Sequence, residues 1–271
     1  MNDQQLAIYS KYFLKLRRDY RFGGAPHKPV LLLSIAELVK RGEITENRIC
    51  ITPELVLEFK NNWSKLVVTP HQPNFALPFF HLRSEPFWKL VPFAGMQIGV
   101  TGSASVKSFR NLKDTVAYAE MDMELFLLLN DPVSNAVLEQ TLLDAYFPET
   151  KGKWREMDTY TIGSEISKQI ISDTSLIYRK RIEELQRKLS RDAFEEEMFV
   201  RGGAFKREIP RYYGYRCAIS GLRVETSYTI QLVDACHIIP FSESYNDTIT
   251  NGIALCPNLH RAFDRGLISI N

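Results

Sequence analysis

The chain has 271 residues, a formal net charge of +2 and 45% hydrophobic residues, a balance typical of a globular protein with one or two domains. This composition excludes a wholly disordered or fibrous chain, and no apolar run approaches the ~18 residues that cross a bilayer. The N-terminus lacks a secretory pattern, and four cysteines are too few for a disulfide scaffold. We therefore expect a cytoplasmic protein without membrane contacts.

Residues 1–150 predict a mostly helical domain with a small sheet. The very apolar stretch 29–40 predicts a buried helix. Two further helices are predicted at 52–66 and 131–147, because each begins with a capping side chain followed by proline. The aromatic-rich stretch 75–91 predicts two short strands joined by a turn.

Residues 151–205 predict a helical connector. Apolar residues keep a helical period along 160–198, charges of both signs fill the other faces, and Gly202-Gly203 predicts a hinge. Such a helix either joins two domains or pairs with a second copy, so a homodimer is possible. From Arg201 to Arg216 the chain has five basic residues against one acid, which suits a phosphate backbone or a solvated linker equally well.

Residues 206–271 have a different pattern. A β-branched strand over 229–233 is predicted to run into the segment 234–240. A polar loop follows, and then a helix over 253–263 and a final strand over 267–270. The predicted order is strand, strand, loop and helix within a short domain.

Two of the five histidines, His237 and His260, lie in this last domain. His237 is expected at the end of a strand and His260 on the helix that follows, so both rings can face one cleft. Asp234 lies three residues before His237. A regular strand directs such residues to opposite faces, so a bulge or the strand end is needed to bring both to one metal ion.

The segments Asp234 to Pro240, Asn251 to Cys256 and His260 to Leu267 closely resemble the HNH endonuclease family. The spacing matches as well, with fourteen residues from His237 to Asn251 and nine from Asn251 to His260. The resemblance covers about the last 60 residues. It implies a ββα-metal nuclease fold and hydrolysis of phosphodiester bonds with one divalent cation.

The resemblance assigns catalytic roles to His237, Asn251 and His260. His237 is the expected general base, since a neutral imidazole near pH 7 can take a proton from water. Asn251 is expected to hold the loop and orient His237. His260 is the expected ligand of Mg²⁺ or Mn²⁺.

The second metal ligand departs from the family pattern. The family often has Asp or His directly before the general base, and Cys236 stands there. Asp234 is the predicted substitute ligand. Asp264 lies one helical turn after His260 and is predicted to orient that ring.

No structural zinc is expected. Many HNH domains carry zinc on two Cys-x-x-Cys pairs. Here Cys217 is followed by Ser220 in place of a second thiol, and Cys256 has no partner at that spacing. Cys236 and Cys256 are instead interpreted as small buried apolar residues.

In the first domain, residues 26–33, 77–83 and 87–90 resemble the sulfur-binding domain of McrA-like type IV restriction enzymes. These enzymes recognise DNA in which a non-bridging phosphate oxygen is replaced by sulfur. A large, polarisable sulfur prefers an apolar cup with a positive rim. The resemblance implies a cup and rim formed by Leu77, Pro78, His27, Lys28, His81 and Arg83. For His27 and Lys28, the alternative is packing at the start of a helix. For the neighbouring aromatic residues, the alternative is a place in the hydrophobic core.

Together these patterns predict an α+β defence enzyme, a modification-dependent restriction endonuclease that binds phosphorothioate-modified double-stranded DNA at 1–150 and cuts it at 206–271. One alternative is a nuclease that reads a modified base such as methylcytosine. The other is a catalytically silent DNA-binding protein that keeps the nuclease fold as a scaffold. The departure at Cys236 gives this last alternative some weight.

Overall fold

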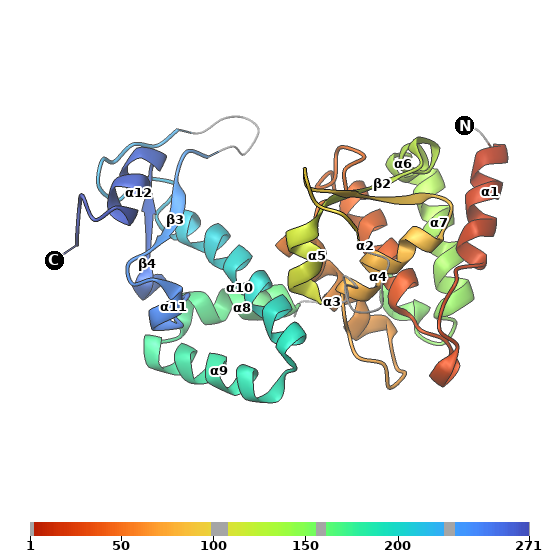
Figure 1. Cartoon of the computed structure of the whole chain (residues 1–271), viewed down its shortest axis with the longest axis horizontal. Coiled ribbons are helices and arrows are strands. Elements are labelled where there is room, and N and C mark those ends of the chain that lie inside the picture. The colour runs from red at the N-terminus through yellow and green to blue at the C-terminus, as the bar shows by residue number, and fades with distance from the viewer. Residues whose placement is uncertain (1–2, 99–107, 156–160, 225–230, 271) are drawn as a thin grey trace. The chain divides into compact units, whose positions relative to one another are not determined.

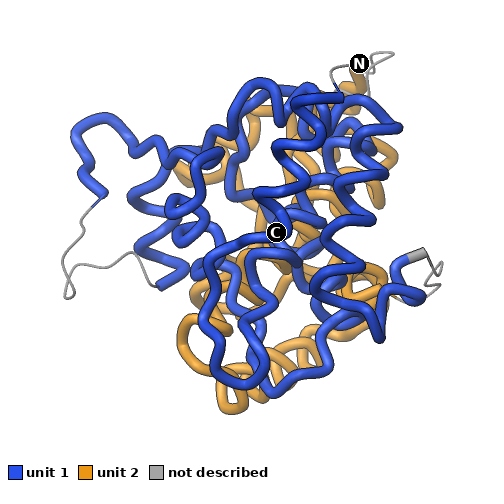
Figure 2. The backbone as a smooth tube through the Cα atoms, turned by 90° about the vertical axis from the view of Figure 1, so that its right-hand side faces the viewer, with its two compact units in different colours: residues 1–159 blue, residues 160–271 orange. Residues whose placement is uncertain are grey.

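The computed structural model describes residues 3–98, 108–155, 161–224 and 231–270. The chain divides into two compact units, Met1–Thr159 and Tyr160–Asn271 (Figure 2). None of the helices within the described ranges is long and apolar enough to cross a membrane. The helices expected as a connector belong to the second unit rather than to a body of their own.

The first unit is an assembly of helices with one antiparallel pair of strands (Figure 1). Its central helix, α2, packs against α3, α4, α6 and α7. This explains why α2 is apolar on almost every side. The elements are α1 (Asp3–Leu14), η1 (Arg21–Gly23), α2 (His27–Lys40), α3 (Pro53–Leu66), α4 (Ala76–His81), η2 (Leu82–Ser84), β1 (Trp88–Pro92), α5 (Phe109–Thr115), β2 (Val116–Met121), α6 (Met123–Asn130), α7 (Pro132–Tyr146) and η3 (Lys151–Arg155).

The capped helix starts are confirmed. The Thr52 side chain accepts a hydrogen bond from the backbone N–H of Leu55 (3.2 Å), and Pro53 begins α3. The Asp131 carboxylate accepts one from the N–H of Ser134 (2.9 Å), and α7 begins at the next proline. In both cases a local hydrogen bond satisfies a backbone donor that the helix itself leaves unpaired.

The predicted hairpin at 75–91 is wrong. Residues Ala76–His81 form α4, and only β1 is a strand, paired with β2 rather than with the preceding segment. Phe75 and Phe79 lie one helical turn apart and pack with ring centroids 5.5 Å apart. Because every residue from Phe75 to Phe80 is apolar, helical and strand periods cannot be distinguished there from the sequence.

The second unit contains α8 (Ile162–Ser172), α9 (Ser175–Lys188), α10 (Arg191–Tyr212), β3 (Asp234–His237), α11 (Phe241–Ser244), η4 (Ile249–Asn251), β4 (Gly252–Leu255) and α12 (Pro257–Asp264). The single long helix predicted over 160–198 is wrong, because α9 and α10 each begin at a new cap. The side chain of Thr174 accepts from the N–H of Ile177, and that of Ser190 accepts from the N–H of Ala193. These bonds start new helices inside one apolar period.

Gly202 and Gly203 lie inside α10 and form no hinge. Each costs roughly 1 kcal/mol of helix propensity, which tertiary burial of α10 outweighs. Gly203, Phe205 and Ile209 are buried on this helix.

The two strands of the second unit pair antiparallel, with Cys236 opposite Ile253 and His237 opposite Gly252. The predicted helix over 253–263 is therefore wrong at its start, because residues 253–255 lie in β4 and α12 begins at Pro257. The described residues after Asp264 form no final strand, and residues 229–230 of the predicted first strand lie outside the described ranges. The strand–strand–helix order is that of a ββα unit.

Helix α10 packs directly on this strand pair. A Cβ atom at Gly252 would lie 2.3 Å from Cδ1 of Ile209 and 3.0 Å from the ring of Phe205. A side chain at position 252 would therefore force Ile209 of α10 to shift.

Candidate active site

His237 ends β3 and is held by two side chains. Its Nε2 lies 2.7 Å from Oδ1 of Asp247, a carboxylate that is almost fully buried. Its ring stacks on Phe205 of α10, with centroids 3.9 Å apart and an interplanar angle of 2°. About a quarter of the His237 side chain remains exposed. The ring is thus fixed in orientation and still reachable from solvent.

Asn251 holds the loop between the two strands. Its Nδ2 donates to the carbonyl oxygens of Ile239 and Asn246, both at 2.9 Å, and its Oδ1 accepts from the N–H of Ile239 at 2.9 Å. Asn246 is the neighbour of Asp247. The buried amide therefore ties the residues that follow His237 to the residues that precede its carboxylate partner.

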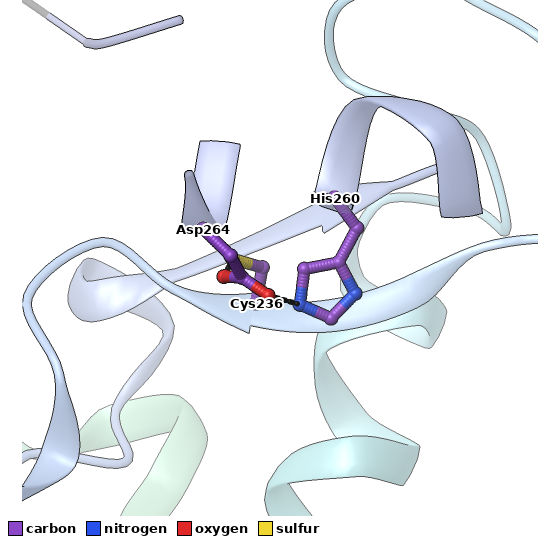
Figure 3. Close-up of side chains that lie close together, drawn as sticks. All are labelled: Cys236, His260 and Asp264. Atoms are coloured by element: carbon purple, nitrogen blue, oxygen red, sulfur yellow. Dashed lines mark hydrogen bonds and ion pairs between the residues drawn. The ribbon is translucent and has the colours of Figure 1, made fainter. Parts of the chain in front are cut away.

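A second cluster joins β3 to α12 (Figure 3). One ligand-type atom from each of Cys236, His260 and Asp264 lies within 4.8 Å of the other two. The Cys236 thiol donates to Oδ1 of Asp264 (3.9 Å), and Nε2 of His260 lies 3.5 Å from Oδ2 of Asp264. The mixed sulfur, nitrogen and oxygen donors are a candidate metal-binding set.

The surroundings of these groups bear on metal binding. Burial, followed by the charge of Asp264 and its hydrogen bond, raises the pKa of the Cys236 thiol to about 11. A metal ion must therefore displace a proton to bind this sulfur. Asp234 lies on the other side of the imidazole, with Oδ2 3.4 Å from Nδ1 of His260. Both carboxylates singled out in the sequence thus flank the same ring.

The two histidines of the motif lie in different contact sets. His237 contacts side chains of α10, α11 and the loop, whereas His260 contacts side chains of β3 and α12. This follows from the strand itself, because neighbouring residues such as Cys236 and His237 point to opposite faces. Asp247 was missed because it lies in a polar loop ten residues after His237, where spacing gives no signal.

In the first unit, two of the expected rim residues lie at the start of α2. His27 is half-buried, its Nε2 lies 2.9 Å from the carbonyl oxygen of Gln72, and burial lowers its pKa. Lys28 is buried, and its ammonium group donates to Glu85 (2.5 Å) and Ser84 (2.8 Å). Lys28 is thus engaged in an internal ion pair.

The remaining expected recognition residues lie on α4 and η2. Pro78 is buried, Leu77 is half-buried and His81 is exposed. The guanidinium of half-buried Arg83 lies 4.0 Å from the centre of the Phe80 ring. Leu77, His81 and Arg83 therefore present surface on one short segment.

The basic run 201–216 does not form a continuous phosphate-binding strip. Arg201 is only 4% exposed and donates to Gln169 (2.9 Å) and Glu197 (3.0 Å). Arg207 donates to Glu208 at 3.1 Å. Arg201 therefore serves the interior of the second unit, whereas Arg207 is exposed.

Comparison with known proteins gives a family match and a similar solved structure. Residues 217–271 match the model of the HNH endonuclease family. A solved structure of the type IV phosphorothioation-dependent restriction endonuclease ScoMcrA is similar over 94% of this chain and 94% of that chain, with 11% identity and a TM-score of 0.39. No curated protein matches.

The family match spans β3, η4, β4 and α12, with His237 on β3, Asn251 on η4 and His260 on α12. The strand pair followed by a helix is the fold that the motif implies. Residues 217–271 are therefore an HNH endonuclease domain.

Proposed function

We propose that the protein is a metal-dependent DNA endonuclease that acts on backbone-modified DNA. The observation that supports the nuclease part is the ββα unit, in which His237, the expected general base, and Cys236, one of the candidate metal ligands, are adjacent residues of β3. Hydrolysis of a phosphodiester needs both, a base to deprotonate water and positive charge to stabilise the transition state.

His237 acts as the general base. Nε2 of the ring faces the Asp247 carboxylate, which fixes Nδ1 as the nitrogen that can accept a proton from water. Stacking on Phe205 keeps the ring from rotating. Asn251 maintains this arrangement by closing the loop between His237 and Asp247.

The cation site that the donors fit best consists of Cys236, His260 and Asp264. A cation held there would stabilise negative charge on the phosphate in the transition state. In this arrangement Nε2 of His260 and the Asp264 carboxylate face the cation. Asp234 then accepts a hydrogen bond from Nδ1 of His260 and orients the ring. The two aspartates thereby exchange the roles that the sequence suggested. Of the two predicted ions, a thiol and an imidazole favour Mn²⁺ over Mg²⁺.

The first unit recognises the modified backbone. This part of the proposal is supported by the sequence resemblance to a sulfur-binding domain, by the exposure of His81 and by the partial exposure of Leu77 and Arg83 on α4 and η2. Leu77 is suited to contact sulfur and Arg83 to contact phosphate. Buried Lys28 and Pro78 maintain the shape of this region rather than touch DNA.

Cleavage of three matched plasmids tests the function directly. One is unmodified, one carries methylcytosine and one carries phosphorothioate linkages, each incubated with Mg²⁺ or Mn²⁺. We expect cutting of the phosphorothioate plasmid alone, and none by His237→Ala. Cutting of the methylated plasmid alone would make the protein a base reader. Binding without any cutting would make it a silent DNA-binding protein.

Binding by the full-length His237→Ala variant tests the mark separately from cleavage. In competition, a duplex with one phosphorothioate should bind more tightly than the unmodified duplex, and the preference should persist at moderate salt. Leu77→Glu should remove the preference, because it places charge beside the sulfur. Arg83→Ala should weaken binding to both duplexes alike. Equal affinity for both duplexes, across both sulfur stereoisomers and several sequences, would exclude a sulfur reader.

A further inference from the structure

A chain of buried polar side chains runs from His237 into helices that precede the matched domain. Oδ2 of Asp247 accepts a hydrogen bond from the hydroxyl of Tyr178 on α9 (3.3 Å). That hydroxyl accepts from Nη1 of Arg201 on α10 (3.5 Å). Arg201 is anchored in turn by Gln169 of α8 at 2.9 Å. The contacts of the general base therefore extend into three helices upstream of its own strand.

Burial makes this chain costly. Tyr178, Arg201 and Asp247 are 0%, 4% and 3% exposed. Each buried polar group requires a partner, since an unpaired one destabilises the fold. Apolar residues would fill the same space without that requirement. Unlike apolar packing, this series of polar side chains gives every hydrogen bond in it a defined direction.

The direction follows from donor and acceptor capacity. A guanidinium can only donate, so Arg201 leaves the proton of the Tyr178 hydroxyl pointing at Asp247. An ionised carboxylate can only accept, so its other oxygen requires a proton on Nε2 of His237. The neutral imidazole is then held with its lone pair on Nδ1, the form that a general base needs.

We propose that Tyr178 and Arg201 are positioning residues that act on His237 through Asp247, and that the catalytic unit of this nuclease includes α9 and α10. The inference rests on His237 being the general base of the proposed nuclease. It adds that the orientation of this base is set by residues outside the segment 217–271.

Asp247→Asn and Tyr178→Phe test the proposal in the full-length protein. In Asp247→Asn, the amide oxygen can accept from His237 only if the amide NH₂ group turns toward the hydroxyl of Tyr178. That hydroxyl already accepts from Arg201, so the hydrogen bonds of the network no longer have a single direction. We expect the single-turnover cleavage rate to fall about 100-fold for Asp247→Asn and roughly tenfold for Tyr178→Phe, with DNA affinity within about twofold of the parent.

The matched control is Tyr146→Phe in the first unit. It removes a hydroxyl that donates to the carbonyl oxygen of Phe13 (2.6 Å), within the unit that does not contain His237. Its cleavage rate should stay within about twofold of the parent. An equal loss of rate in Tyr178→Phe and Tyr146→Phe would reduce Tyr178 to a structural role and overturn the proposal.

The ring form of His237 provides a readout independent of cleavage. Two-dimensional ¹⁵N spectra of histidine-labelled, metal-free protein at pH 8 report which ring nitrogen carries the proton, and the signal that His237→Ala removes assigns the residue. We expect the Nε2–H form in the parent and in Tyr146→Phe, and a mixture of forms in Asp247→Asn and Tyr178→Phe. A pure Nε2–H form in all variants would contradict the inference.

The same variants separate this inference from the function on which it depends. Normal cleavage by His237→Ala would remove His237 as the base and the inference with it. An inactive His237→Ala beside a fully active Tyr178→Phe would leave the nuclease assignment in place and overturn the positioning role alone.

Discussion

The surroundings of His237 and His260 are built in different ways. His237 is ordered by Asp247, which is buried, and by Phe205 of α10, which lies outside the family match. His260 is flanked by residues of β3 and α12, and one of its carboxylate partners, Asp264, is 61% exposed on its side chain. The proposed general base is thus pre-ordered by neighbouring side chains, whereas the candidate metal-ligand set keeps an exposed carboxylate that a cation could reach. Only the candidate metal-ligand set lies entirely within the motif.

The largest expected effect on cleavage comes from removing the imidazole of His237. His237→Ala should lower the single-turnover cleavage rate by roughly 10³-fold and leave DNA affinity unchanged, because a general base acts in the transition state. Metal affinity, measured by calorimetry on the same variant, should also be unchanged. Parental cleavage at saturating metal would refute the assignment of the base.

Removal of the metal-ligand candidate His260 should have a smaller effect on cleavage, and that effect should be partly reversible. His260→Ala should lower cleavage about 100-fold at limiting Mn²⁺, because a cation ligand is lost. Excess Mn²⁺ should restore part of the rate, which it cannot do for His237→Ala. The test is a Mn²⁺ titration of both variants side by side, and identical titration curves would remove the distinction between the two histidines.

The two aspartates beside His260 sharpen the comparison within the metal set. Asp264→Asn should weaken Mn²⁺ binding by about 10–100-fold, whereas Asp234→Asn, which keeps a hydrogen-bond acceptor for the ring, should weaken it only a few-fold. Each variant is the other's control, since both lose one carboxylate next to the same imidazole. The reverse order would restore Asp234 as the ligand predicted from the sequence.

The participation of Cys236 predicts a pH dependence. Because burial and Asp264 raise the pKa of this thiol to about 11, a cation that binds the sulfur must release one proton at any pH below that value. Affinity for Mn²⁺ should therefore rise roughly tenfold per pH unit between about pH 7.5 and 8.5. Cys236→Ser should lose this slope. A slope unchanged by the substitution would leave the sulfur outside the site.

The smallest effect is expected from the packing that supports His237. Gly252→Ala should destabilise the second unit by about 1–3 kcal/mol in urea unfolding, because its Cβ would overlap Ile209. Gly202→Ala is the control, since a Cβ there meets nothing within 4 Å and should stabilise the helix by about 0.5–1 kcal/mol. Equal stability of both variants would show that β4 and α10 are less tightly packed than described.

Local signals in the sequence were sufficient for some of the fold. Thr52 and Asp131 determine helix starts through hydrogen bonds to residues three positions away, so the sequence contains all that is needed. Residues 253–255 were predicted as helix because their strand pairing depends on Asp234 to Cys236, which are distant in sequence. The apolar stretch at Phe75 failed for a different reason, since its period is masked when almost every residue is buried.

The candidate site divides in the same way. The motif spacing locates His237, Asn251 and His260 because the ββα unit is short and regular. Asp247 escaped prediction because nothing in a polar loop marks one acid above the others, and its place beside His237 depends on the amide of Asn251 folding the loop back. Tyr178 cannot be predicted from local patterns, because its hydrogen-bond partner Asp247 lies 69 residues away in the sequence.

The stacking of His237 on Phe205 has a consequence for domain exchange. Modular nucleases are commonly recombined by joining a cutting module to a new recognition module at the edge of the recognised motif. Here a fusion made at residue 217 would leave Phe205 and Tyr178 behind, together with the helix against which β4 packs. If His237 is the general base, a transplantable cutting module has to begin at the boundary between the two units, before α8, so that His237 is transferred with the helices that orient it.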